Sequence, residues 1–187
     1  KRLTMYRLRA KVSLAAEEGL AVWLGGKDGV QYADPRVAAL PVRAIAARAG
    51  APAVDDAYDA ARLAFGVPEF GRDFAGEEVF LLDVNYDALN AVSYKKGCFV
   101  GQEVTSRMKR KGEIRKRTLT ARGEGVTRGA AVTAGDSSIG EVLSARAGAG
   151  IALIRLDRLA EARGAGTAIL AAGAPVQIDV PAYLETL

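Results

Sequence analysis

The sequence lacks histidine altogether and has a single cysteine, Cys98, among 187 residues. Without histidine, Ser-His-Asp and Cys-His catalysis and histidine-based zinc sites are excluded. One cysteine cannot form an internal disulfide or a cysteine-rich metal site, which favours a reducing compartment. A metal ion or cluster held by Cys98 would therefore need further ligands from a partner chain or a small thiol.

Long apolar runs are also missing, since none approaches the roughly 18 residues that a membrane-spanning helix needs. The opening segment, KRLTMYRLRAKVSLAAEEG, lacks the continuous apolar core of a signal peptide. The composition, 50% hydrophobic and 26% charged, is typical of a globular protein that buries a core. These features predict a cytoplasmic protein with no membrane contact.

Charge is unevenly distributed, although the formal net charge is only +4. The segment from Asp55 to Asp87 contains nine acidic and two basic residues, and the segment from Ser93 to Arg117 contains nine basic and two acidic residues. This asymmetry predicts a surface for an anion such as RNA, an acidic protein or a polyglutamate tail, with residues 107–117 as the contact. The alternative is that the two segments face each other or are solvated. No aromatic residue interrupts the basic tract, so any RNA binding would be unspecific.

Apolar periodicity predicts strands and helices in the first part of the chain. A hairpin is expected at 21–35, with alternating apolar residues on both sides of the glycine-rich turn Gly25–Gly29. Another strand is expected at 41–48, with a helix as the alternative. Helices are predicted at 55–68, 82–92 and 101–111; the first begins at an Asp cap and the last carries an apolar stripe of Val100, Val104 and Met108.

The pattern of apolar residues changes near Ile114. Short apolar segments separated by Gly, Asp and Ser then continue to Leu187, with helical turns near 155–164. Such spacing predicts a small antiparallel β-barrel. The sequence therefore predicts two domains, 1–113 and 114–187.

Cys98 is the first candidate for chemistry. Lys95 and Lys96 precede it and the predicted third helix follows, and both a nearby cation and a helix N-terminus favour the thiolate. Gly97 and Gly101 permit tight backbone geometry beside the sulfur. The alternative is a small buried side chain, the commoner role of a lone cysteine.

Two motifs resemble those of a known family. KGCFVGQEVTSR resembles the K-G-C-[FY]-x-G-Q-E-x-x-x-R signature of the YgfZ family, and YDAARLAFGVPEFGRD resembles the segment that precedes this signature. The order and spacing of the motifs fit the family across nearly the whole chain. The matching positions are Lys96, Gly97, Cys98, Phe99, Gly101, Gln102, Glu103 and Arg107, with Tyr58, Arg62, Gly66, Pro68, Gly71 and Asp73 upstream.

The resemblance implies an α+β fold, with a ferredoxin-like GcvT-type middle domain followed by the barrel. It implies a folate-binding-type accessory factor in assembly or repair of [4Fe–4S] proteins, including tRNA-modifying enzymes, with iron–sulfur client proteins as partners. Cys98 would engage a cluster, a persulfide or a partner thiol transiently. Lys96 would support its ionisation, Gln102 and Glu103 would hold the turn and helix start, and tetrahydrofolate would be the cofactor.

Two departures leave alternatives open. Family members carry a further N-terminal region that completes the folate cavity, and this chain starts too late to contain it. The aminomethyltransferases have Glu where this sequence has Ala64. A tetrahydrofolate-dependent aminomethyltransferase, like the glycine-cleavage T protein, is the second reading, although no carboxylate base is identifiable. An RNA-binding module that uses residues 107–117 is the third. Whether the chain is an enzyme stays open.

Overall fold

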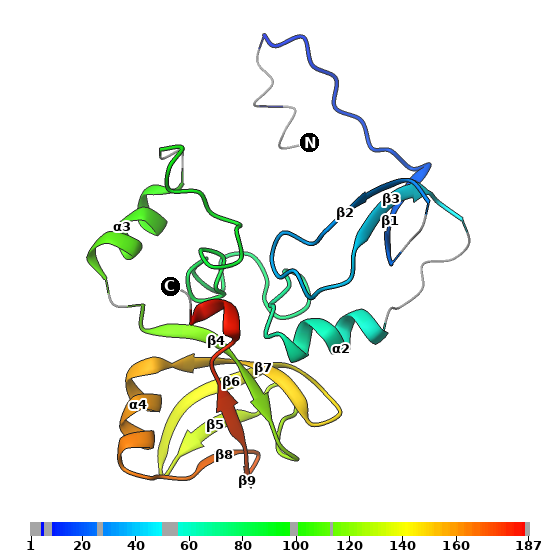
Figure 1. Ribbon diagram of the computed structural model, residues 1–187. Coiled ribbons are helices and arrows are strands. Elements are labelled where there is room, and N and C mark those ends of the chain that lie inside the picture. Colours follow the sequence, from blue (N-terminus) through cyan, green and yellow to red (C-terminus); the bar gives the residue numbers. More distant parts are fainter. Residues whose placement is uncertain are drawn as a thin grey trace. The chain divides into compact units, whose positions relative to one another are not determined.

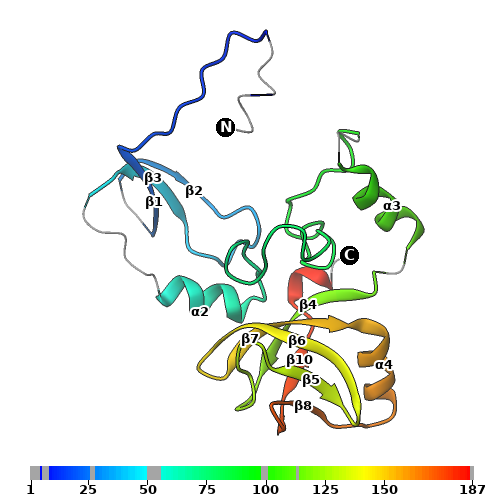
Figure 2. The same cartoon turned by 180° about the vertical axis from the view of Figure 1, so that it is seen from behind.

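A computed structural model describes residues 5, 9–25, 28–49, 56–97, 101–112 and 114–185. The chain divides into two compact units, one formed by Lys1–Ala33 and Pro41–Val54 and the other by Asp34–Leu40 and Asp55–Leu187. Figures 1 and 2 show their elements from opposite sides. In the part of the chain that the structure describes, no helix has the length and apolar character needed to cross a bilayer.

The first unit contains a three-stranded sheet in the order β1-β3-β2 (Figure 1). Its strands are β1 (Leu20–Leu24), β2 (Val30–Tyr32) and β3 (Arg43–Ala47). The strand predicted at 41–48 is confirmed, but the hairpin predicted at 21–35 is wrong because β3 lies between β1 and β2 and pairs antiparallel with both. Gly29 permits this pairing: its φ is +82°, and a Cβ there would lie 2.2 Å from the carbonyl oxygen of Ile45 on β3.

The alternation seen in the sequence places an apolar row across this sheet. Val22, Ile45 and Val30 are paired side by side on the three strands. They are 55%, 39% and 70% exposed, respectively. Within the part of the chain that the structure describes, this apolar row is therefore partly exposed.

The second unit contains a seven-stranded antiparallel sheet in the order β10-β4-β7-β6-β5-β8-β9, which is a nearly closed barrel (Figures 1 and 2). Its strands are β4 (Lys116–Arg122), β5 (Ala131–Ala134), β6 (Ser137–Arg146), β7 (Ala149–Arg155), β8 (Ile169–Ala171), β9 (Ala174–Pro175) and β10 (Gln177–Asp179). Helix α4 (Leu156–Gly164) connects β7 to β8, and a 3-10 turn, η1 (Ala182–Leu184), follows β10. The predicted β-barrel and the helical turns near 155–164 are confirmed.

The barrel encloses the larger of two apolar clusters in the second unit. Buried side chains from its strands, from α4 and from the loop between β4 and β5 form this cluster, namely Leu119, Ala121, Val126, Val132, Ile139, Val142, Ala152, Ile154, Leu159, Ala171 and Ile178. Burial of this apolar area is the main favourable term in the stability of the barrel. The smaller cluster joins Leu40, Val67 and Leu89 outside the barrel. The GcvT-type arrangement of the preceding region and the domain boundary near residue 114 stay predictions.

Two of the three predicted helices are confirmed, as α2 (Asp56–Ala64) and α3 (Glu103–Lys111). The Asp55 cap predicted for the first lies outside the described residues. Gly66 ends the α2 segment with a φ of +67°, and a Cβ there would lie 2.7 Å from Pro181 Cγ. Only glycine suits both the conformation and the close approach.

The helix predicted at 82–92 is wrong, because this segment forms a series of turns. Asn85 and Asn90 have φ angles of 62° and 58°, which a right-handed helix does not accommodate. Each amide side chain ties the turn to a distant segment: Asn85 Nδ2 donates to the Thr118 carbonyl oxygen at 2.7 Å, and Asn90 Nδ2 donates to the Pro35 carbonyl oxygen at 2.7 Å. These tertiary hydrogen bonds override the helical periodicity.

Candidate functional site

The residues on both sides of Cys98 are held together by polar contacts. Lys96 Nζ donates to Gln102 Oε1 at 2.6 Å, and Gln102 Nε2 donates to the Ser93 carbonyl oxygen at 2.9 Å. Glu103 Oε2 accepts a hydrogen bond from the Gly101 amide at 3.0 Å. Gln102 thus links the segment before the cysteine to the start of α3, while Cys98 and Phe99 themselves lie outside the described residues.

The predicted glycine conformations agree with a tight turn here. Gly97 and Gly101 have φ angles of 82° and 87°. These values are in the left-handed region, which residues with a Cβ rarely adopt. The backbone is therefore left-handed at Gly97, directly before the cysteine, and at Gly101, three residues after it.

A groove of about 390 Å³ lies beside Gln102. We name it the Gln102 groove; it is lined by Leu81, Ala91, Val92, Ser93, Lys96, Gly101, Gln102 and Thr105. Two of the eight, Lys96 and Gln102, also make the contacts that bracket Cys98. The predicted site residues thus adjoin a hollow that the sequence did not indicate.

Helix α3 uses a different face for packing than its apolar stripe suggests. Val104 is 55% exposed, whereas Thr105 and Ser106 are buried. Arg107, the last residue of the signature, is exposed. Helical spacing would allow an ion pair between Glu103 and Arg107. Within the described residues, Glu103 instead accepts a hydrogen bond from the Gly101 amide.

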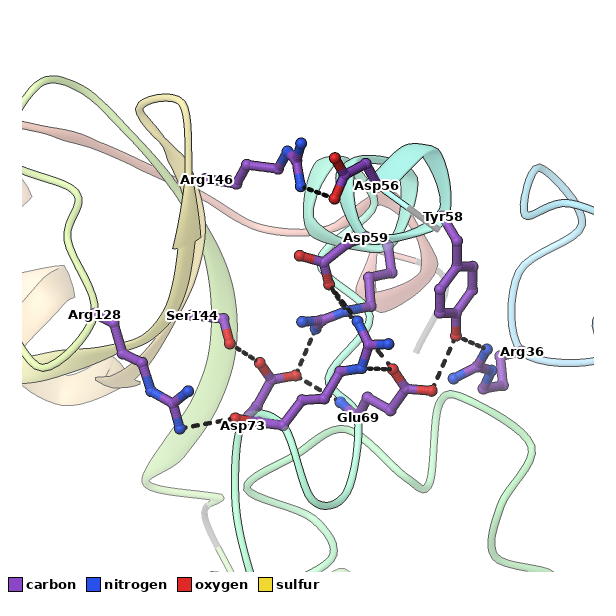
Figure 3. A network of polar contacts seen from close by, with 11 residues as sticks. Arg36, Asp56, Tyr58, Asp59, Glu69, Asp73, Arg128, Ser144 and Arg146 are labelled. Atoms are coloured by element: carbon purple, nitrogen blue, oxygen red, sulfur yellow. Dashed lines mark hydrogen bonds and ion pairs between the residues drawn. The ribbon is translucent and has the colours of Figure 1, made fainter. Parts of the chain in front are cut away.

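The upstream motif forms a buried ionic network (Figure 3). Arg62 Nη1 lies 2.7 Å from Asp73 Oδ2, and their side chains are only 2% and 0% exposed. Asp73 also accepts hydrogen bonds from the Glu69 amide at 2.6 Å and from the Ser144 hydroxyl. Because Ser144 lies on β6, this network attaches α2 and the turn after it to the barrel.

A second group of contacts extends this network (Figure 3). The Tyr58 hydroxyl donates to Glu69 Oε1 at 3.2 Å and accepts from Arg36 Nη2 at 2.8 Å. Arg36 also pairs with Asp34 at 2.7 Å, and this hydrogen bond raises the pKa of the Arg36 guanidinium above its ordinary value. Tyr58 and Arg62, both predicted as binding residues, thus take part in a structural network of ion pairs and hydrogen bonds. Their predicted role in ligand binding stays a prediction.

The basic tract is partly neutralised inside the second unit. Arg117, only 8% exposed at its side chain, pairs with Asp87 at 2.5 Å, and Lys109 Nζ lies 3.5 Å from the same carboxylate. Burial alone would raise the pKa of Asp87, but the hydrogen bond and charge of Arg117 outweigh it and lower that pKa. Fewer cations are therefore available to an anionic partner than residues 107–117 suggest. The predicted RNA or acidic-protein contact is unsupported by these observations.

Several residues in these networks carried no signal in the sequence. Ser144 lies 71 positions from Asp73, and Asn85 lies 33 positions from Thr118. Because 82–92 was predicted to be a helix, the ion pair between Asp87 and Arg117 was not expected either. The acidic-then-basic charge distribution was the one available signal for this pair, and it supports the alternative in which the two segments face each other.

The groove does not fit tetrahydrofolate. A pterin ring presents several N–H donors, which a buried site satisfies with acceptors such as a carboxylate. None of the residues lining the Gln102 groove is acidic, and Ala64 is exposed at the end of α2. Nor do the described residues contain a group of three or more Cys, Asp or Glu side chains suited to a metal ion. We therefore derive no folate-dependent step.

Comparison with known proteins identifies the barrel. Residues 115–186 match the family described as CAF17, C-terminal beta-barrel domain. The second unit thus contains a CAF17-type C-terminal barrel.

Similarity to individual proteins extends beyond the barrel. The chain is 30% identical over 190 residues to the human iron-sulfur cluster assembly factor IBA57, mitochondrial, covering 85% of this chain and 53% of that protein. The mouse protein of the same name is 29% identical over 191 residues, with the same coverage. A Dictyostelium discoideum homolog is 42% identical over 60 residues, which are 32% of this chain and 15% of that protein. The barrel thus matches the CAF17 family, and the similar proteins are named IBA57. The YgfZ family of the motif resemblance is related to them.

The chain spans about half the length of the human and mouse relatives it matches. The expectation of a cytoplasmic protein is contradicted, because the human, mouse and Neurospora crassa relatives are named as mitochondrial.

Proposed function

We infer that the protein carrying this chain is an accessory factor in iron–sulfur protein assembly. The observation that carries this inference is the similarity to iron-sulfur cluster assembly factors over 85% of the chain. The matched region includes both motifs and continues into the barrel. Iron–sulfur client proteins are the partners this role requires, and the cluster is cargo rather than a resident cofactor.

Cys98 is the residue that we propose carries the chemistry. Its thiolate would engage a cluster, a persulfide or a partner thiol transiently, because thiolates are the form that binds iron and attacks sulfur. Lys96, which lies two residues before it, would support ionisation by its positive charge. The contacts of Lys96 with Gln102 and of Gln102 with Ser93 support this role, since they hold the two ends of the cysteine segment close together.

The thiol proposal is tested by Cys98→Ser in the full-length protein. Cells depleted of their own assembly factor would receive the wild type, Cys98→Ser or the control Ser138→Ala, an exposed serine on β6. We expect Cys98→Ser to recover at least about tenfold less [4Fe–4S] enzyme activity, because a hydroxyl does not ionise near neutral pH as a thiol does. Equal recovery by all three proteins would remove Cys98 from the mechanism.

The role of Gln102 is tested separately. Gln102→Ala removes both bracketing hydrogen bonds without touching the thiol. We expect a partial loss of client activity together with an altered rate of Cys98 alkylation, measured over a pH series. An alkylation profile identical to that of the wild type would contradict a role of Gln102 in holding the cysteine segment.

A further inference from the structure

Residues Asp34–Leu40 belong to the second unit, although the chain on both sides of them belongs to the first. We name this stretch the crossing segment. It connects β2, which ends at Tyr32, to β3, which begins at Arg43, and it contains no helix or strand of its own. Contacts with the rest of the second unit therefore hold it in place.

Two of these contacts join the crossing segment to the end of the turns at 82–92. Leu40, which is 4% exposed, lies with Leu89 in the smaller apolar cluster. The Pro35 carbonyl oxygen accepts the 2.7 Å hydrogen bond from Asn90 Nδ2. The contacts are made by adjacent residues, one apolar and one polar, so the crossing segment fixes where this series of turns ends.

Asn90 is suited to making this connection. The Ala91 amide donates to the Tyr86 carbonyl oxygen at 3.0 Å, which closes the last turn around Asn90. Asn90 itself has a φ of 58°, in the left-handed region that asparagine tolerates better than most residues. Its side-chain amide is thus presented from a closed turn toward the crossing segment.

A short stretch of chain links Asn90 to the cysteine segment. Only Ala91 and Val92 separate Asn90 from Ser93, and these residues form no helix or strand. From Asn90 to Ser93 the backbone spans at most about 11 Å when fully extended. The Ser93 carbonyl oxygen accepts from Gln102 Nε2 at 2.9 Å. The place of this acceptor therefore depends on where Asn90 is held.

We propose that Asn90 is a positioning residue for Cys98. Its hydrogen bond to the Pro35 carbonyl oxygen fixes the place of Ser93, and Ser93 supplies the acceptor that holds Gln102 beside the cysteine segment. The sequence conceals this relation, because Pro35 lies 55 positions before Asn90. The inference rests on the proposed function, since it assigns a residue that prepares the thiol proposed to carry the chemistry.

Alkylation of Cys98 by iodoacetamide in the full-length protein tests this role, followed by mass spectrometry of the peptide that contains Cys98. Asn90→Gly removes the donor and suits the positive φ, and Asn90→Asp keeps the side-chain size but has no N–H group. Asn90 is exposed, so neither change disturbs the apolar cluster. We expect both to change the rate constant at least about threefold, in the same direction as Gln102→Ala.

Two controls separate positioning from a general effect of the substitutions. Ala172→Gly places glycine at another exposed position with a positive φ, 47°, between β8 and β9, and should alkylate like the wild type. A double-mutant cycle gives the second control. In the Gln102→Ala background, Asn90→Gly should change the rate less than about 1.5-fold, because the residue through which it acts is already gone.

Three results would overturn the inference: wild-type alkylation of Asn90→Asp, wild-type alkylation of Gln102→Ala, or independent effects of Asn90→Gly and Gln102→Ala. Cys98→Ser separates this inference from the proposed function. If Cys98→Ser loses client activity while Asn90→Gly alkylates like the wild type, the positioning role fails alone. If the cycle gives the expected result but Cys98→Ser retains full client activity, the proposed function fails and Asn90 still positions the thiol.

Discussion

Replacing Arg62 by Met should destabilise the second unit strongly. The Arg62 and Asp73 side chains are 2% and 0% exposed and lie 2.7 Å apart. Methionine has a similar length but no charge, so the Asp73 carboxylate would remain buried without a cation. Removing one partner of a buried ion pair costs about 3–5 kcal/mol. Ser144→Ala removes one hydrogen bond to the same carboxylate and should cost about 1–3 kcal/mol.

Arg72→Met is the matched control for Arg62→Met. Arg72 pairs with Asp59 at 2.9 Å and with Glu69 at 3.2 Å, but its side chain is 45% exposed. Exposed ion pairs contribute about 0–1 kcal/mol, so we expect a small loss. The double variant Arg62→Met/Asp73→Asn should be more stable than Arg62→Met alone, because no unpaired buried charge remains.

Urea unfolding followed by circular dichroism measures these differences. Hydrogen exchange of the β6 amides assigns the loss to the attachment of α2 to the barrel, because Ser144 lies on that strand. The reasoning would be refuted if Arg62→Met cost no more than Arg72→Met. It would also be refuted if the double variant were less stable than Arg62→Met.

Three further predictions concern other parts of the second unit. Burial raises the pKa of Tyr183 from 10.0 to about 12. The stability that its neutral phenol contributes should therefore be present below about pH 10 and be lost as pH rises toward 12. In urea unfolding over this pH range, the free energy of unfolding should decline less steeply for Tyr183→Phe than for the wild type. Asn85→Ala leaves the Thr118 carbonyl oxygen without the 2.7 Å donor and places alanine at a φ of 62°, so it should cost about 2–4 kcal/mol in the same assay, and a loss below that of Arg72→Met would contradict this. Titration of tetrahydrofolate should release no heat attributable to the Gln102 groove, and heat that disappears in Ala91→Trp would show that the groove accepts a pterin.

The barrel was predictable because its information is local. Short apolar segments between Gly, Asp and Ser define strands and turns independently of their partners. The sheet of the first unit was not, since Val22 and Val30 each pair with Ile45, which follows both in the chain. The alternation at 21–35 by itself predicts that its two strands pair with each other. In the structure they do not, because β3 lies between them.

The helix prediction for 82–92 was wrong for a related reason. Its apolar spacing suits a helix, but the amides of Asn85 and Asn90 bond to Thr118 and Pro35, in segments on either side. Asparagine tolerates a positive φ better than most residues, and it offers a side chain that replaces missing helical hydrogen bonds. Two asparagines in an otherwise helical pattern are a signal of turns, but their partners could not be read from the sequence.

The two motifs of the family resemblance have different physical roles. In the upstream motif, Tyr58 and Arg62 are buried and their polar groups are used within the second unit. In the signature, Lys96 and Arg107 are exposed, and Gln102 borders the groove. Replacing Tyr58 or Arg62 should therefore act through stability, whereas replacing Gln102 should act through the cysteine segment that it holds. The family resemblance alone does not distinguish the two motifs. The burial of their side chains does, because Tyr58 and Arg62 are buried whereas Lys96 and Arg107 are exposed.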